Sequence, residues 1–123
     1  MRNDPGAMTI AQVRQDFAAM AAGWRAVAAT SAPRARQAAE VQVFNQMVVA
    51  LHGRVAGAQV WGALEVQLLA EGVQGNGRFA VSGQWRADQS VTGYRAGDRI
   101  ALSEVVFSRL AGVVLDGLAR QSV

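Results

Sequence analysis

Large apolar residues recur at alternating gaps of three and four along two stretches of the first half of this chain. Such spacing repeats every seven residues and is typical of the buried seam between packed α-helices. The first stretch predicts a helix from about residue 10 to residue 29, through Ile10, Val13, Phe17, Met20, Trp24 and Val27. The second predicts another helix through Val41, Phe44, Val48, Leu51 and Val55. The simplest expectation is two helices whose seams face each other.

The start of the first helix carries two overlapping signals. Thr9 and Gln12 have the spacing of a capping box, in which each side chain bonds the backbone amide of the other residue. Met8 and Val13 have the spacing of a hydrophobic staple around the same cap. The helix is therefore predicted to begin directly after Thr9, and residues 1–8 are predicted to form a flexible segment before it.

Pro33 interrupts the apolar pattern between the two stretches. Proline lacks the amide donor that a helix interior needs, and it disfavours a helical conformation in the preceding residue. A second helix can begin here, with Ser31 or Ala32 near its cap and Pro33 in its first turn. The chain then forms a helical hairpin, or else one long helix kinked at Pro33, whose apolar stripe is free to meet another chain.

Beyond the second seam the apolar period changes to two. Residues 64–68 and 79–86 alternate between apolar and polar side chains, which is typical of strands with one buried and one exposed face. The glycine-rich segment 72–77 lies between them, so the two strands are predicted to pair as an antiparallel hairpin. A shorter third strand is expected in one of two places, residues 91–94 or residues 99–102.

Two registers of this predicted strand pair keep the same faces buried. In the preferred register Glu71 lies opposite Arg78. A slip of two residues pairs Glu65 with Arg86 instead. Either register places the Glu65 carboxylate on the exposed face of the sheet.

The last predicted element is an apolar helix. Ser103 is predicted to be its N-cap, and Glu104 is an acid in the first turn, where it complements the helix dipole. From about residue 104 to residue 119 a broad apolar stripe includes Val105, Val106, Phe107, Leu110, Val113, Val114, Leu115 and Leu118. A stripe this wide needs cover on more than one side.

These elements together predict an α+β fold class. Its parts are an N-terminal helical pair (a hairpin or one helix kinked at Pro33), an antiparallel sheet of two to three strands, and a C-terminal apolar helix. The chain has 123 residues, of which 51% are hydrophobic and 17% charged, so it is expected to fold around one core. We therefore expect a single domain over residues 1–123.

The residue types leave little chemistry for an active site. Cysteine is absent, which excludes disulfides, thiolate nucleophiles and cysteine-ligated metals. His52 is the only histidine, and no pair of carboxylates has the spacing of a metal or acid–base site. The glycines of residues 72–77 are followed by no lysine, so they predict no phosphate loop. The expectation is a protein that is not an enzyme, with no cofactor and no metal.

Arginine supplies all 12 basic residues, against 9 acidic residues, for a formal net charge of +3. This modest charge does not by itself indicate nucleic-acid binding. In the predicted strand pair Arg78 and Arg86 lie on the exposed face, whereas Phe79 and Trp85 point to the core, which argues against a surface for stacking bases. A small arginine-rich nucleic-acid-binding regulator is therefore an alternative function, with nucleic acid as a partner that is not favoured.

The C-terminal half resembles a known class of proteins. Alternating residues end in Gly83-Gln84-Trp85-Arg86 and precede an apolar terminal helix, an order that resembles small auxiliary subunits of bacterial envelope transport. The resemblance implies an envelope-transport accessory, although the lipoprotein signal of such subunits is not visible. It assigns no residue roles. The predicted fold class alone leaves room for a small-ligand carrier, which is a further alternative.

The favoured expectation is a structural or assembly subunit that self-associates or docks into a larger bacterial or phage machine, such as a virion or a secretion apparatus. Two helical seams and a broad apolar helix offer more apolar surface than a small sheet covers. The partner is expected to be a second copy or another protein, the compartment the cytoplasm or a virion, and no run is long enough to span a membrane. The candidate interaction residues are Phe17, Met20, Trp24, Phe44, Leu51, Gly75, Asn76, Gly77, Leu110 and Val114.

Overall fold

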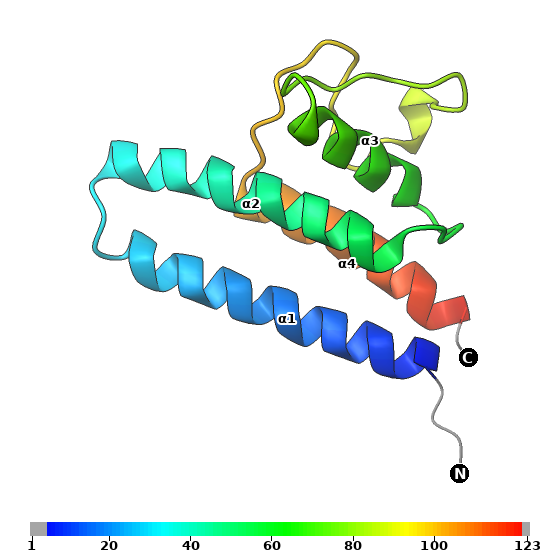
Figure 1. Cartoon of the computed structure of the whole chain (residues 1–123), viewed down its shortest axis with the longest axis horizontal. Helices are drawn as coiled ribbons and strands as arrows, with labels where there is room; N and C mark the ends of the chain where they lie inside the picture. Colours follow the sequence, from blue (N-terminus) through cyan, green and yellow to red (C-terminus); the bar gives the residue numbers. More distant parts are fainter. Residues whose placement is uncertain (1–4, 122–123) are drawn as a thin grey trace.

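The computed structural model describes residues 5–121, with side chains from Ile10 onward. Its α-helices pack around a common core, and a long irregular segment over residues 75–103 lies against α3 (Figure 1). α1 packs on α2 and α4, while α3 packs on α2. In chain order the elements are α1 (Pro5–Ala28), α2 (Pro33–Val55), α3 (Ala63–Gln74), the short 3-10 helix η1 (Ala87–Gln89) and α4 (Glu104–Gln121).

α1 and α2 form an antiparallel helical hairpin (Figure 1). Pro33 is the first residue of α2, where its missing amide donor leaves no helical bond unmade. The preceding residue, Ala32, is extended, with φ −63° and ψ 151°. The Ser31 hydroxyl donates to the Val27 carbonyl at 2.8 Å and so satisfies one of the free carbonyls at the end of α1. Of the two predicted alternatives at Pro33, the turn is the one that forms.

The predicted start of the first helix is wrong. α1 begins at Pro5, so Thr9 lies inside the helix and is not its N-cap. Proline is favoured at a first helical position, and no helix breaker follows Pro5 before Thr9 apart from Gly6. Residues 5–8, predicted to be flexible, therefore belong to α1, and residues 1–4 lie outside the described part of the chain.

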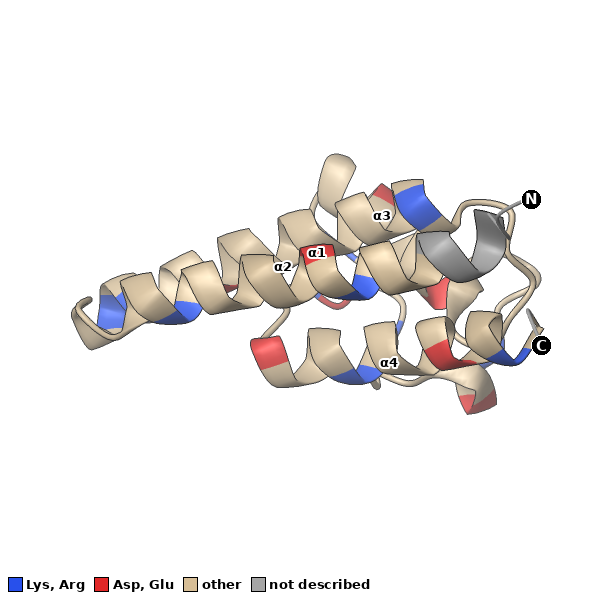
Figure 2. Cartoon of the chain, turned by 90° about the horizontal axis from the view of Figure 1, so that it is seen from below, with Lys and Arg blue, Asp and Glu red and all other residues tan. Residues whose placement is uncertain are grey.

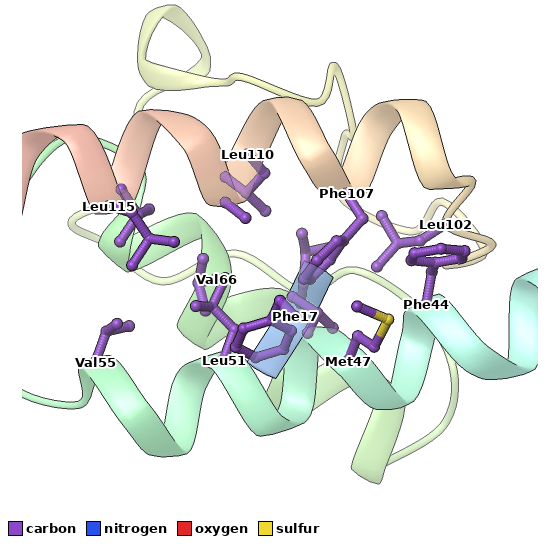
Figure 3. Close-up of a cluster of buried hydrophobic side chains, with 14 of the residues drawn as sticks. Phe17, Phe44, Met47, Leu51, Val55, Val66, Leu102, Phe107, Leu110 and Leu115 are labelled. Atoms are coloured by element: carbon purple, nitrogen blue, oxygen red, sulfur yellow. The ribbon is translucent and has the colours of Figure 1, made fainter. Parts of the chain in front are cut away.

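Aromatic rings join three helices at the centre of the core (Figure 3). The Phe107 ring of α4 lies 5.6 Å from the Phe17 ring of α1 and 5.7 Å from the Phe44 ring of α2, measured between centroids. Trp24 of α1 meets Phe44 edge-on, with centroids 5.3 Å apart and planes at 77°. Such tilted and edge-on pairs are the preferred aromatic geometries. The helical seams read from the sequence thus meet inside one chain.

The predicted antiparallel sheet does not form, so the α+β fold class is wrong. Within residues 5–121 the regular structure is helical, and the one β-type pairing is an isolated antiparallel bridge between Arg78 and Arg99. Residues 64–68 lie inside α3. Their alternation is compatible with a helix because Leu64 and Leu68, four residues apart, share one helix face.

The segments predicted as the other strands are also irregular. Residues 79–86 contain a turn, in which the Trp85 amide donates to the Ser82 carbonyl at 3.0 Å, and residues 91–94 and 99–102 are loop apart from the bridge at Arg99. The glycine-rich segment 72–77, predicted to connect two strands, instead ends α3 and turns the chain. The predicted strand registers therefore do not exist.

Residues 75–103 are held against the helices by their own buried side chains and by hydrogen bonds with helix side chains, and not by the backbone pairing of a sheet. Phe79, Ile100 and Leu102 are buried in the common core. The side-chain amide of Asn45 on α2 donates to the Ile100 carbonyl at 3.1 Å and accepts from the Leu102 amide at 3.0 Å. This paired contact satisfies the backbone on both sides of Ala101 as a neighbouring strand would.

The start of α4 matches the prediction. The Ser103 hydroxyl accepts a hydrogen bond from the Val106 amide at 3.2 Å, which makes Ser103 the N-cap, and Glu104 lies in the first turn. The Glu40 carboxylate of α2 also accepts from the Glu104 amide at 3.0 Å. Two acceptors therefore satisfy two of the free amides of this helix end.

Gly72 lets the irregular segment lie directly on α3. A β-carbon at this position would stand 2.5 Å from the Arg78 carbonyl oxygen and 2.5 Å from Cδ1 of Ile100. Both distances are far inside van der Waals contact, and the first involves backbone that cannot rotate away. Glycine is thus required here by close approach of two chain segments.

Replacing Gly72 with alanine is expected to lower the free energy of unfolding by about 1–3 kcal/mol, the typical cost of overpacking. The matched control is Gly112→Ala in α4, because a β-carbon at Gly112 meets nothing within 4 Å. That change is expected to raise the free energy of unfolding by about 0.5–1 kcal/mol, the difference in helix propensity. Urea denaturation of both variants measures the two shifts. Equal effects of the two changes would contradict the contact at Gly72.

Candidate functional site

Half of the predicted interaction residues are buried within the single chain. They contribute to the core, where each is 7% exposed or less: Phe17, Phe44, Leu51, Leu110 and Val114. Trp24 is half-buried, and its indole nitrogen is buried without an acceptor among the described residues. The segment 75–103 adds Phe79, Ile100 and Leu102 to the same core. Much of the apparent surplus of apolar surface is therefore satisfied by the chain itself.

The predicted glycine-rich finger, Gly75, Asn76 and Gly77, is a tight turn. The amides of Gly75 and Gly77 both donate to the Gly72 carbonyl, at 3.2 and 2.8 Å. The Asn76 side chain accepts from the Arg78 amide at 3.1 Å, and Gly77 has φ 79°, a conformation that favours glycine. These three residues cap the end of α3 and start the following segment, so the structure gives each of them a local role.

Met20 is the predicted interaction residue that reaches the surface as a large apolar side chain. It is 45% exposed on the side of α1 next to α2. Val27, 58% exposed, lies two helical turns further along the same side. A hollow of about 460 Å³ lies beside Met20, lined by Met20, Gln42, Val43, Gln46, Met47 and Ala50. We call the surface formed by Met20, Gly23, Val27, Gln42, Val43, Gln46 and Ala50 the α1–α2 face.

Every charged side chain of α1 from residue 10 onward is paired with another helix. The pairs are Arg14 with Asp116 of α4 at 2.7 Å, Asp16 with Arg54 of α2 at 2.7 Å, and Arg25 with Glu104 of α4. The rest of the exposed α1 surface carries no charge and is mostly small: Ala18, Ala19, Ala22, Gly23 and Ala26. Figure 2 shows α1 largely free of charged residues when it is seen from below.

The ion pairs shift the ionisation of their members. Hydrogen bonds first from Arg54 and then from Gln12 hold the pKa of the Asp16 carboxyl below its usual value. The hydrogen bond and the charge of Glu104 raise the pKa of the Arg25 guanidinium above its usual value. These exposed pairs fix the flanks of α1 against its neighbours, and exposed pairs contribute little to stability.

Glu65 is a charged residue whose burial the sequence does not predict. It was placed on the exposed face of a strand, yet it is 1% exposed. Its carboxylate accepts hydrogen bonds from the amides of Val91 at 2.7 Å and Thr92 at 3.1 Å, from the Ser90 hydroxyl at 3.1 Å, and from the Thr92 hydroxyl. Four donors compensate the burial of the charge. Glu65 therefore ties the irregular segment to α3.

His52 lies half-buried on α2 beside a hollow of about 380 Å³. Among the described residues no group of three or more His, Cys, Asp or Glu side chains lies close enough together to hold a metal ion. No helix in the described range has the length and apolar character needed to cross a membrane.

Comparisons of the chain with family models, with curated proteins and with solved structures gave no match. Proposals about its function therefore rest on the geometry above.

Proposed function

We propose that this protein is a non-catalytic assembly module that binds a second copy of itself through the α1–α2 face. The observation that carries the proposal is an exposed helical face with large apolar residues and no charge. Met20 and Val27 are 45% and 58% exposed on it, beside the apolar hollow of α2. Such a module would suit a structural role in a larger bacterial or phage assembly.

The neutrality of the face supports a second copy as the occupant. In a two-fold dimer the same patch meets itself, so any net charge on the patch would oppose a like charge. On α1 the described charges are all directed to the flanks and paired with α2 or α4. The residues that define the α1–α2 face carry no charge, and the exposed Arg36, seven residues before Val43 on the same side of α2, lies beyond its end.

The sizes of the side chains support close packing of helices. Gly23 and the neighbouring exposed alanines of α1 leave room for another helix, because the distance between packed helices depends on the side chains at the contact. Met20 is an unbranched, adaptable side chain suited to filling an irregular gap. The hollow of about 460 Å³ beside it has the space to receive the Met20 or Val27 side chain of the second copy.

The double variant Met20→Glu, Val27→Glu tests the proposal. It places two carboxylates per copy on the α1–α2 face, where each would meet like charge in the dimer. Opposed like charges cost several kcal/mol, so the dimer dissociation constant is expected to rise about 100-fold. Sedimentation velocity over a concentration series measures the shift from dimer mass to monomer mass.

The matched control is Val105→Glu on α4, which is 66% exposed and lies outside the α1–α2 face. Its mass distribution is expected to equal that of the wild-type chain. A wild-type chain that sediments as a monomer at the highest attainable concentration overturns the proposal. Equal weakening by Val105→Glu would show association through another surface.

A further inference from the structure

A second surface of the chain has the features of a ligand-binding site. Two adjoining hollows of about 320 and 380 Å³ lie between the α2–α3 connection and the region of η1. They share four lining residues, Gln59, Val60, Leu64 and Gln84, and we call the two hollows together the cleft. Each volume falls within the range of small-molecule sites, about 300–1,000 Å³. The α2–α3 connection and η1 lie at the same end of the molecule (Figure 1).

Buried contacts hold the α2–α3 wall of the cleft. Gly117 of α4 packs against Val60 so closely that a β-carbon on Gly117 would lie 3.0 Å from Cβ of Val60. Gly62 has φ 89° and also packs on α4, where an added β-carbon would meet Val114 at 2.9 Å. These contacts fix the backbone on both sides of Trp61.

The opposite wall is held by an aromatic contact and by the buried carboxylate. The Trp85 ring meets the buried Phe79 ring edge-on, with centroids 5.5 Å apart and planes at 77°. Directly after η1, residues 90–92 are bonded to Glu65. Both walls therefore present their side chains from a fixed backbone, which lowers the entropy lost when a ligand binds.

The lining of the cleft is aromatic and amide-rich, with no arginine. Trp61 is 55% exposed, and Trp85 is half-buried. The side-chain amides of Gln84 and Gln89 make no hydrogen bond within the described part of the chain and line the cleft with free donors and acceptors. The Glu65 carboxylate, which also lines the cleft, already accepts hydrogen bonds from four donors of the chain.

We propose that this cleft binds a neutral carbohydrate. A sugar ring has an apolar face of C–H groups that stacks on an indole, and hydroxyls at its edge that both donate and accept hydrogen bonds. Trp61 and Trp85 supply the stacking surfaces, and the amides of Gln84 and Gln89 supply paired donors and acceptors. The lining has no arginine, and its one histidine, His52, lines only the hollow that lacks Trp61 and Trp85, so the part of the cleft beside the two indoles favours an uncharged ligand. This inference does not depend on the self-association of α1 and α2.

Titration of the full chain with neutral trisaccharides tests the inference. The probes are chitotriose, cellotriose and maltotriose, and the readout is the NMR shift of the Trp61 and Trp85 indole N–H signals. At least one probe is expected to shift both signals with saturation. Trp61→Ala is expected to raise the dissociation constant of that probe about 2- to 10-fold, followed through the Trp85 signal, and Gln84→Ala is expected to weaken binding in the same direction.

Gln42→Ala is the matched control, because Gln42 is an exposed glutamine on α2 outside the cleft. It is expected to leave the dissociation constant unchanged, as is Met20→Glu, which separates this site from the α1–α2 face. Three results overturn the inference: no saturable shift with any trisaccharide, a loss of affinity in Gln42→Ala equal to that in Gln84→Ala, or tighter binding of AMP than of every trisaccharide.

Discussion

Replacing Phe44 with alanine is expected to lower the free energy of unfolding by about 3–5 kcal/mol, among the largest effects of any single substitution in this chain. Phe44 is fully buried and joins α1, α2 and α4 through its contacts with Trp24 and Phe107. The substitution loses the free energy gained by transferring a large apolar side chain from water to the core. It also leaves a cavity where the ring packed against its neighbours. Urea denaturation measures the loss as a lower midpoint.

Domains of this size are stable by about 5–15 kcal/mol, so Phe44→Ala can leave too little folded protein to measure. Phe44→Leu is the second variant, and it is expected to show a smaller loss in the same direction. Val105→Ala on α4, at a position 66% exposed, is the surface control and is expected to change stability by less than about 0.5 kcal/mol. If Phe44→Leu behaves like this control, Phe44 does not anchor the core.

The same variants separate a core role from an interface role. The sequence placed Phe44 among candidate interaction residues, whereas the structure buries it within one chain. Its contribution to stability is therefore expected to be independent of protein concentration. A loss that grows on dilution would assign Phe44 to a contact between copies.

Replacing Glu65 with leucine is expected to lower the free energy of unfolding by about 2–6 kcal/mol. The change leaves the buried amides of Val91 and Thr92 without their acceptor, and each unsatisfied group costs about 1–3 kcal/mol. The hydroxyls of Ser90 and Thr92 lose the same acceptor. Urea denaturation gives the total loss.

Hydrogen exchange locates this loss in the chain. In Glu65→Leu the amides of residues 91 and 92 are expected to exchange faster than in the wild type by a larger factor than those of α2, because the irregular segment separates from α3 before the helical hairpin opens. Glu71→Gln is the matched control, since Glu71 is an exposed carboxylate on the same helix, bonded at 3.2 Å to Gln67. It is expected to change stability by less than about 0.5 kcal/mol. Equal effects of the two substitutions would remove the anchoring role of Glu65.

Three of the helices, α1, α2 and α4, could be predicted because their signals are local. The spacing of Phe17 and Phe44 within their seams, the turn at Pro33 and the cap at Ser103 each depend on residues a few positions apart, and each corresponds to an observed feature. The exposed Met20 was also selected from the sequence, but the same seam spacing selected Phe17, which is buried. A periodic pattern identifies an apolar stripe without showing which neighbour covers it.

α3 was misread because it is covered on more than one side. α2 packs against one side and residues 75–103 lie against another, so the exposed residues of α3 form only a narrow polar stripe at helical spacing: Gln67, Glu71 and Gln74. Gln67 is the one member of this stripe within residues 64–68, so that short window shows no helical period. The short alternation at residues 64–68 therefore favours a strand when the sequence is considered alone.

The sequence by itself determined two helical seams interrupted at Pro33, the terminal helix and the scarcity of reactive groups, because these depend on residue types and short-range spacing. Only the tertiary structure decided the absence of a sheet in the described chain, the burial of Glu65 and the positions of the α1–α2 face and the cleft. The donors to Glu65 lie 25 to 27 residues further along the chain, and the cleft joins residues from two separate connections. Interactions between such distant segments leave no periodic mark in a single sequence, since their geometry exists only when the chain is folded.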